Sequence, residues 1–114
     1  MATPTPLSAS ELKIRLDSGE ALQLVDVREA MELDLARLST PVIHLPLSES
    51  ERWMGQLSDL IERDRPVVVL CQAGIRSWQC ACWLMEAQGY EPVGTLQGGI
   101  DAWSVSVDPS LPRY

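Results

Sequence analysis

Short apolar runs alternate with helix-forming segments along this 114-residue chain, and this alternation constrains the fold more than any other feature. The clearest runs are residues 22–27, 66–70 and 93–96. Apolar runs this short, bounded by turn residues, are typical of strands buried on both faces. Weaker signals at residues 5–7 and 42–45 bring the expected total to about five strands. Strands alternating with helices predict an α/β fold, with a small parallel sheet that carries helices on both faces.

Capping patterns mark where helices are expected to begin. Ser8 and Glu11 have the spacing of a capping box, and an apolar stripe follows them. Ser48 and Glu51 repeat that spacing ahead of a second helix, whose apolar residues recur at helical intervals and are expected in the core. A short helix over residues 29–36 lies between the two.

The segment 75–88 is apolar on nearly every side, which predicts a buried helix. We therefore expect Trp78, Cys80 and Cys82 to be packing residues rather than parts of a site. A last short helix follows a pair of glycines. Beyond it, prolines predict an extended tail over residues 105–114.

Length and charge limit what the chain can do. We expect residues 1–114 to form one domain, with a core at about 5–104. No apolar stretch approaches the length needed to cross a bilayer, and the first residues lack a signal-peptide pattern, so a cytoplasmic location is expected. The net charge of −7, without clusters of Lys and Arg, argues against nucleic-acid and membrane partners. An anionic substrate must therefore be held by local groups.

The cysteine pattern fits neither a disulfide framework nor a metal site. The chain has three cysteines and no secretory signal, so disulfides are not expected. Cys80 and Cys82 are two residues apart on a predicted helix and so point in different directions. The single histidine, His44, is distant in sequence and no C-x-x-C pair exists, which argues against zinc.

One segment between a predicted strand and a predicted helix has the pattern of a reactive site. Its residues are Cys71, Gln72, Ala73, Gly74, Ile75, Arg76 and Ser77. A thiolate at a helix start beside a fixed cation has a lowered pKa, and the backbone N–H groups of such a turn converge on an anion. The pattern indicates sulfur or phosphorus chemistry at Cys71, and the alternative is a small buried hydrophobic cysteine.

Asp26 and Arg28 occupy a similar position after the strand at 22–27. The carboxyl ends of parallel strands meet at one edge of a sheet, so the two side chains are candidates to support the Cys71 segment. Alternatively, Asp26 caps the next helix, three residues before Glu29.

Four segments in order carry a family resemblance. They are Leu24-Val25-Asp26-Val27-Arg28-Glu29, His44-Leu45-Pro46-Leu47, the loop from Cys71 to Ser77, and Leu96-Gln97-Gly98-Gly99-Ile100-Asp101-Ala102-Trp103. Over most of its length, the chain resembles the rhodanese-like sulfurtransferases. The resemblance implies a single rhodanese-like domain that moves a sulfane sulfur from a donor such as thiosulfate to a thiol or cyanide acceptor, or to a sulfur-accepting protein.

The resemblance also implies a role for each loop residue. Cys71 would carry the sulfur as a persulfide, with no metal or organic cofactor. The backbone N–H groups from Gln72 to Arg76 would stabilise the anionic sulfur. The substrate-binding residues would be Gln72, Ala73, Gly74, Ile75 and Ser77. Arg76 would orient the loop or hold an anionic leaving group, and Ser77 would cap the following helix. Arg76 is the loop's only charged residue, so thiosulfate is expected to bind weakly.

Two other functions remain open from the sequence. Cysteine phosphatases and arsenate reductases also hold a thiolate in an anion-binding cup, but they typically show C-x5-R, whereas four residues separate Cys71 from Arg76. A non-catalytic binding module with the same fold is the other alternative, because fold does not guarantee activity.

Overall fold

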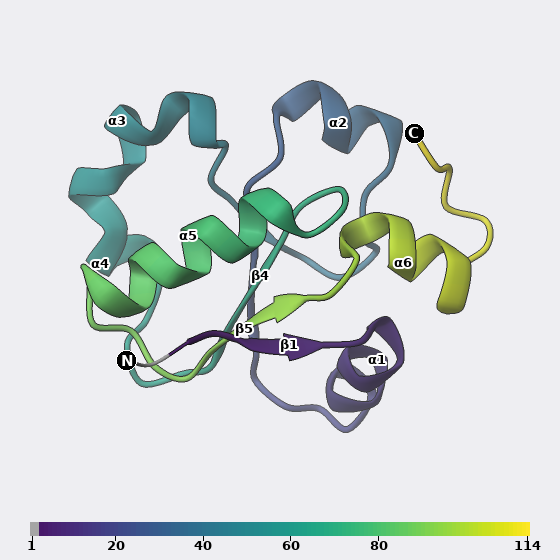
Figure 1. The fold of residues 1–114 in the computed structure, drawn as a ribbon, viewed down its shortest axis with the longest axis horizontal. Coiled ribbons are helices and arrows are strands. Elements are labelled where there is room, and N and C mark those ends of the chain that lie inside the picture. Colours follow the sequence, from purple (N-terminus) through teal and green to yellow (C-terminus); the bar gives the residue numbers. More distant parts are fainter. Residues whose placement is uncertain (1–2) are drawn as a thin grey trace.

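The computed structural model describes residues 3–114, which form a parallel sheet with helices on both faces (Figure 1). The strands of this part of the chain are β1 (Thr5–Leu7), β2 (Gln23–Asp26), β3 (Ile43–His44), β4 (Val67–Leu70) and β5 (Val93–Leu96). Their order across the sheet is β1-β5-β4-β2-β3, and every neighbouring pair is parallel. The predicted α/β class and the sheet of about five strands are confirmed.

The helices pack on the sheet as two layers. Over residues 3–114 they are α1 (Ala9–Asp17), α2 (Ala30–Leu35), α3 (Ser50–Trp53), α4 (Leu57–Leu60), α5 (Ile75–Glu86) and α6 (Gly99–Ser106), with 3-10 turns η1 (Leu47–Glu49) and η2 (Met54–Gln56). Successive residues of β4 pack against opposite helix layers, because side chains alternate between the two faces along a strand. Val67 and Val69 pack in the core beneath α5, and Val68 and Leu70 pack in the core beneath α1 and α6. Among the described residues, no helix is both long enough and apolar enough to cross a membrane.

The centre of the sheet positions the candidate site. β4 lies between β5 and β2, and all three strands run in the same direction. The loops after them therefore meet at one edge of the sheet, with Cys71 directly after the central strand.

One capping box is confirmed and the other is wrong. The Glu11 backbone N–H donates to Ser8 Oγ at 3.1 Å, and the Ser8 N–H donates to Glu11 Oε1 at 2.9 Å. Ser48 instead lies inside η1, where its hydroxyl donates to the carboxylate of Glu29. With that hydroxyl engaged elsewhere, the expected single helix is a chain of short turns, η1, α3, η2 and α4. Of its four periodic apolar residues, Trp53, Leu57 and Ile61 are buried as predicted, and Leu60 is half-buried against the same core.

The prediction of an extended tail is also wrong. α6 continues to Ser106, and residues 108–111 form a turn in which the Leu111 N–H donates to Asp108 O at 3.0 Å. Aspartate at the first position of a turn with proline at the second is a favourable combination, so Pro109 turns the chain here. The Leu111 side chain then packs against the core beneath α6.

Candidate active site

Cys71 lies buried beneath the turn that joins β4 to α5. Its residue is 1% exposed, and its Sγ accepts backbone N–H groups from Gly74 at 3.1 Å and Ser77 at 3.3 Å. The Ser77 hydroxyl lies 3.4 Å from the same sulfur. Hydrogen bonds from N–H groups at a helix start favour an anionic sulfur. Of the N–H groups from Gln72 to Arg76 that were expected to stabilise the sulfur, that of Gly74 donates to Cys71 Sγ, and the second donor, Ser77, lies one residue beyond that range.

Two glycines allow the loop to fold this tightly. Gly74 has φ +112°, in the left-handed region, and ends the turn at the start of α5. Gly99, with φ +64°, packs against the loop so closely that a Cβ there would lie 2.5 Å from Cys71 O and nearer still to Gln72 O. The next two residues, Ile100 and Asp101, donate their N–H groups to those same carbonyls at 2.9 and 3.1 Å. The start of α6 thus fixes the floor of the loop.

The side chains of the loop residues do not surround the sulfur. Ser77 was expected to cap α5, but it lies one turn inside the helix and donates its hydroxyl to Gly74 O at 3.1 Å. The amide of Gln72 donates to the backbone oxygen of Tyr114. Ala73 and Ile75 are exposed, the latter by 73%. Apart from the Ser77 hydroxyl, the groups of these residues that contact Cys71 Sγ are backbone N–H groups.

Arg76 pairs with a carboxylate that sequence reasoning missed. Its Nη1 and Nη2 donate to the two oxygens of Glu32 on α2 at 2.7 and 2.8 Å. These hydrogen bonds lower the pKa of Glu32 to about 2. The same bonds raise the pKa of Arg76. The guanidinium is therefore committed to fixing the loop against α2. The one sequence signal for Glu32 is its position three residues after Glu29, which is the spacing of a helix cap. The Glu29 backbone N–H does donate to the Glu32 carboxylate.

Asp26 and Arg28 form a buried ion pair beside this group. Arg28 Nη2 lies 2.8 Å from Asp26 Oδ2, and neither residue is more than 1% exposed. Asp26 also accepts the Arg28 backbone N–H at 3.1 Å, so its carboxylate is engaged with Arg28 and does not cap α2. Arg28 Nη1 further donates to Ala36 O at 2.7 Å. The pair ties β2 to the end of α2 and so supports the element that carries Glu32.

The other two cysteines lie on α5. Cys80 is buried as predicted, and burial raises the pKa of its thiol to about 12, which suppresses its reactivity. Cys82 is half-buried. In the part of the chain that the structure describes, no three His, Cys, Asp or Glu side chains cluster as metal ligands would.

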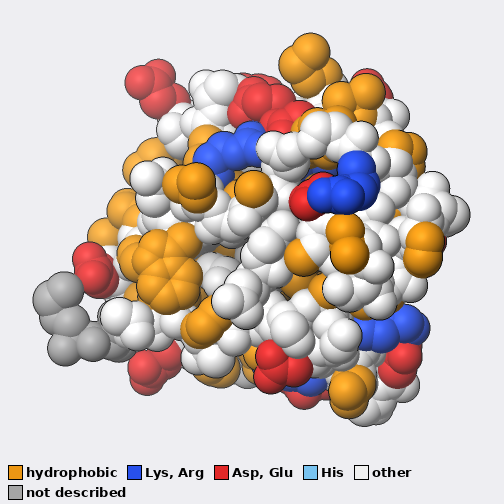
Figure 2. All heavy atoms as spheres, turned by 45° about the vertical axis from the view of Figure 1, so that its right-hand side comes forward, with side chains coloured by type: hydrophobic (Ala, Val, Ile, Leu, Met, Phe, Trp, Pro, Cys, Tyr) orange, Lys and Arg blue, Asp and Glu red, His pale blue; other side chains and the backbone are white. Residues whose placement is uncertain are grey.

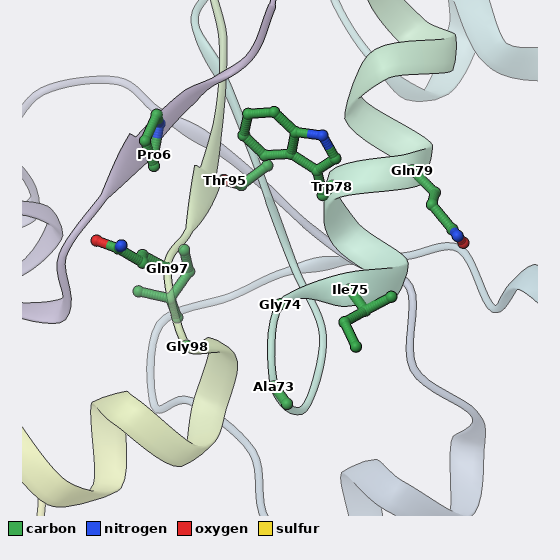
Figure 3. A pocket seen from close by; sticks show the side chains of 10 residues that line it. Pro6, Ala73, Gly74, Ile75, Trp78, Gln79, Thr95, Gln97 and Gly98 are labelled. Carbon is green, nitrogen blue, oxygen red and sulfur yellow. The ribbon is translucent and has the colours of Figure 1, made fainter.

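A groove of about 560 Å³ borders the loop on the β1 side of the sheet (Figure 3). Ala73, Gly74 and Ile75 form its edge, and the ring of Trp78 extends from α5 over it towards Pro6. Trp78 is 39% exposed, so the expectation that it packs inside was wrong. Because α5 lies on the surface of the sheet, part of its apolar circumference faces this groove. Among residues 3–114, no side chain that lines the groove carries a charge.

A family profile for the rhodanese-like domain matches residues 8–106. The chain belongs to the rhodanese-like family. The match spans all four segments that suggested the resemblance, the Cys71 loop among them, and the resemblance is confirmed.

Comparisons with individual proteins place this rhodanese-like domain among both short and long relatives. It is 35% identical over 102 residues to a sulfurtransferase of Allochromatium vinosum, covering 86% of each chain. It is 39% identical over 92 residues to the chloroplastic rhodanese-like/PpiC domain-containing protein 12 of Arabidopsis thaliana, covering 81% of this chain and 30% of that protein. Its fold matches the single-domain sulfurtransferase RDL2 of Saccharomyces cerevisiae with a TM-score of 0.77, at 21% identity over 97% of each chain. The domain spans less than a third of several curated relatives.

Lysine and arginine side chains do not gather on the face that Figure 2 shows; they lie singly, close to acidic ones. The exposed pairs on the molecule include Arg113 with Asp101 and Arg37 with Asp34. Because these cations are paired with carboxylates and the net charge is −7, an incoming anion experiences little long-range attraction.

Proposed function

We propose that this domain is a sulfurtransferase that carries a sulfane sulfur as a persulfide on Cys71. The observation that carries the proposal is the pair of backbone N–H groups, from Gly74 and Ser77, that donate to Cys71 Sγ. It is supported by the relative of similar length from Allochromatium vinosum, which is named a sulfurtransferase.

Two displacements at sulfur make up the proposed reaction. The Cys71 thiolate attacks the outer sulfur of a donor; an S–S bond to Cys71 forms, and the donor's own bond to that sulfur breaks. With thiosulfate, sulfite leaves with the electron pair. A cyanide or thiolate acceptor then attacks the outer sulfur, which yields thiocyanate or a new persulfide and restores the Cys71 thiolate.

The N–H groups at the start of α5 can stabilise the negatively charged sulfur in both steps. The first N–H groups of a helix have no acceptor within it, so those of Ile75 and Arg76 stand next to the turn that covers Cys71. The outer sulfur of a persulfide is anionic, and preorganised N–H donors stabilise it without reorganisation. The backbone would thus hold the carried sulfur in place of charged side chains.

The loop favours a donor of low charge over thiosulfate. Both terminal nitrogens of Arg76 are paired with Glu32, and the groove beside the loop has no charged lining. In the part of the chain that the structure describes, a dianion therefore finds no free side-chain cation at the loop. We propose a persulfide of a small thiol, or of a partner protein, as the better donor, and a thiol as the acceptor.

Mass spectrometry of the intact protein tests the proposal. After incubation with thiosulfate or with glutathione persulfide, followed by removal of the donor, wild type should gain one sulfur atom. Cys71→Ser should gain none, whereas Cys82→Ser, which changes a half-buried cysteine of α5, should gain sulfur like wild type. Addition of cyanide should remove the sulfur and release thiocyanate.

Two other results would replace the proposal. Wild type that gains no sulfur from either donor would support the non-catalytic binding module. Hydrolysis of an aryl phosphate that is lost in Cys71→Ser would support a cysteine phosphatase.

A further inference from the structure

The C-terminal segment runs back along α6 to the candidate site. After α6 the chain turns at residues 108–111 and ends beside α2 (Figure 1), where the backbone oxygen of its last residue accepts the Gln72 amide. Ser104 Oγ donates to Leu111 O at 2.5 Å, and Arg113 Nε donates to Asp101 Oδ1 at 2.8 Å. These contacts bind the segment along α6, so its last residue reaches a defined position.

Tyr114 contacts groups at both ends of the loop. At one end, its backbone oxygen accepts the side-chain amide of Gln72. At the other, its hydroxyl lies 2.9 Å from Glu32 Oε1, the same oxygen that accepts Arg76 Nη2 at 2.8 Å. Tyr114 therefore joins Gln72 directly, and Arg76 through Glu32.

The direction of the hydroxyl hydrogen bonds follows from the partners. Arg28 Nη1 lies 3.0 Å from the Tyr114 oxygen, and a guanidinium can only donate. The hydroxyl oxygen thus accepts from Arg28, and its own proton is left for Glu32 Oε1. Burial raises the pKa of Tyr114, which keeps this proton in place at neutral pH.

We propose that Tyr114 is a positioning residue for the Cys71 loop. Its hydroxyl orients the Glu32 carboxylate, which orients Arg76, and the loop is thereby held closed over the sulfur. The inference rests on the proposed function only in that the closed loop is the state that stabilises a persulfide. The closing of the loop itself does not depend on sulfur transfer.

Glu32 shows why one hydroxyl matters. Its two oxygens accept four donors, which are Arg76 Nη1, Arg76 Nη2, the Glu29 backbone N–H and the Tyr114 hydroxyl. The carboxylate is therefore fixed in one orientation, and Arg76 needs that orientation for its two-point contact. Without the hydroxyl, the fully buried Arg28 loses one of its hydrogen-bond acceptors. Within the described part of the chain, Glu32 Oε1 then accepts from Arg76 Nη2 as its one remaining donor.

The test measures the exposure of the sulfur, which needs no sulfur-transfer activity. Tyr114→Phe keeps the ring and removes only the hydroxyl. We expect iodoacetamide to alkylate Cys71 about threefold to tenfold faster in this variant, as loss of one hydrogen bond allows. Cys80, in the same protein, reports on global opening and should be unaffected. Peptide mass spectrometry reads both cysteines in one experiment.

Two controls separate positioning from a general loss of stability. Tyr90→Phe removes a hydroxyl that donates to Ile61 O at 2.9 Å, outside the hydrogen bonds that join Arg28, Glu32 and Arg76, and should not change the ratio of Cys71 to Cys80 alkylation. In an Arg76→Ala background the route from the Tyr114 hydroxyl through Glu32 to the loop is cut, while the contact of the Tyr114 backbone oxygen with Gln72 is kept in both variants, so Tyr114→Phe should have no further effect on Cys71.

The possible outcomes are distinct. If Cys71 alkylation is unchanged in Tyr114→Phe, rises in step with that of Cys80, or rises equally in the Arg76→Ala background, the positioning role is wrong. A failure of sulfur loading in wild type would refute the proposed function and leave this test intact. If both proposals hold, Tyr114→Phe loses persulfide to cyanide faster than wild type does.

Discussion

Gly99 offers the sharpest test of how the loop is built. Substitution by alanine adds a Cβ that would lie 2.5 Å from Cys71 O and nearer still to Gln72 O. The loop must retreat by about 1 Å to restore van der Waals contact. That displacement stretches the hydrogen bonds from the backbone N–H groups of Ile100 and Asp101, now 2.9 and 3.1 Å, beyond useful length.

The expected loss of stability has two parts. Alanine at φ +64° costs about 1–2 kcal/mol relative to glycine, because of its Cβ. Two weakened hydrogen bonds cost about 1 kcal/mol each. For Gly99→Ala, we therefore expect the free energy of unfolding to fall by about 3–4 kcal/mol, which lowers the Tm by an amount on the order of 10–20 °C.

Sulfur loading should suffer as well, because a shift of about 1 Å in reacting groups can cost about a hundredfold in rate. Calorimetry gives the Tm, and mass spectrometry gives the loading rate at a temperature where the variant is folded. Gly55→Ala is the matched control, since a Cβ at Gly55 meets nothing within 4 Å and its φ is not positive. If Gly99→Ala melts and loads sulfur like Gly55→Ala, the close approach of α6 to the loop is irrelevant.

Three further changes test the surrounding groups. Asp26→Asn leaves the fully buried Arg28 without a counter-charge, so the free energy of unfolding should fall by about 3–5 kcal/mol; an unchanged denaturant midpoint would contradict this. Arg76→Ala should raise the barrier to sulfur transfer by about 2–4 kcal/mol, and unaltered kinetics would remove Arg76 from the mechanism. The pKa of Glu32 is lowered to about 2, so its stabilising contribution is complete above the ordinary value of 4.5 and is lost as the pH falls towards 2. The stability advantage of wild type over Glu32→Gln should thus shrink over that interval, and a constant difference would show that the carboxylate charge is not responsible.

The sequence predicted the sheet and the loop because their signals are local. The strand at residues 67–70 is apolar throughout, and the loop follows it directly in the chain. The capping box of Ser8 and Glu11 is equally local and was confirmed. In each case the residues that decide the structure are neighbours in sequence, so their pattern was sufficient.

The partners of the loop were not predictable in this way. Arg76 pairs with Glu32 across 44 residues, and Tyr114 reaches Glu32 across 82. Such contacts depend on how α2 and the C-terminal segment fold back, and the proline-rich tail indicated an extended chain. Ser48 shows the same limit, because its pairing with Glu29, 19 residues away, replaced the local capping pattern.

Cys71 is buried, so the contacts that hold its loop closed affect both steps of the proposed reaction. A sulfur in a residue that is 1% exposed cannot be reached by a donor until the loop moves, whereas the loop N–H groups stabilise a persulfide only when the loop is closed. Loading and retention therefore place opposite demands on the contact between Arg76 and Glu32, which holds the loop against α2. A looser loop would expose the thiolate faster and hold the sulfur less well. The rate of transfer would then depend on how often the contacts that close the loop open, as much as on the reactivity of the sulfur.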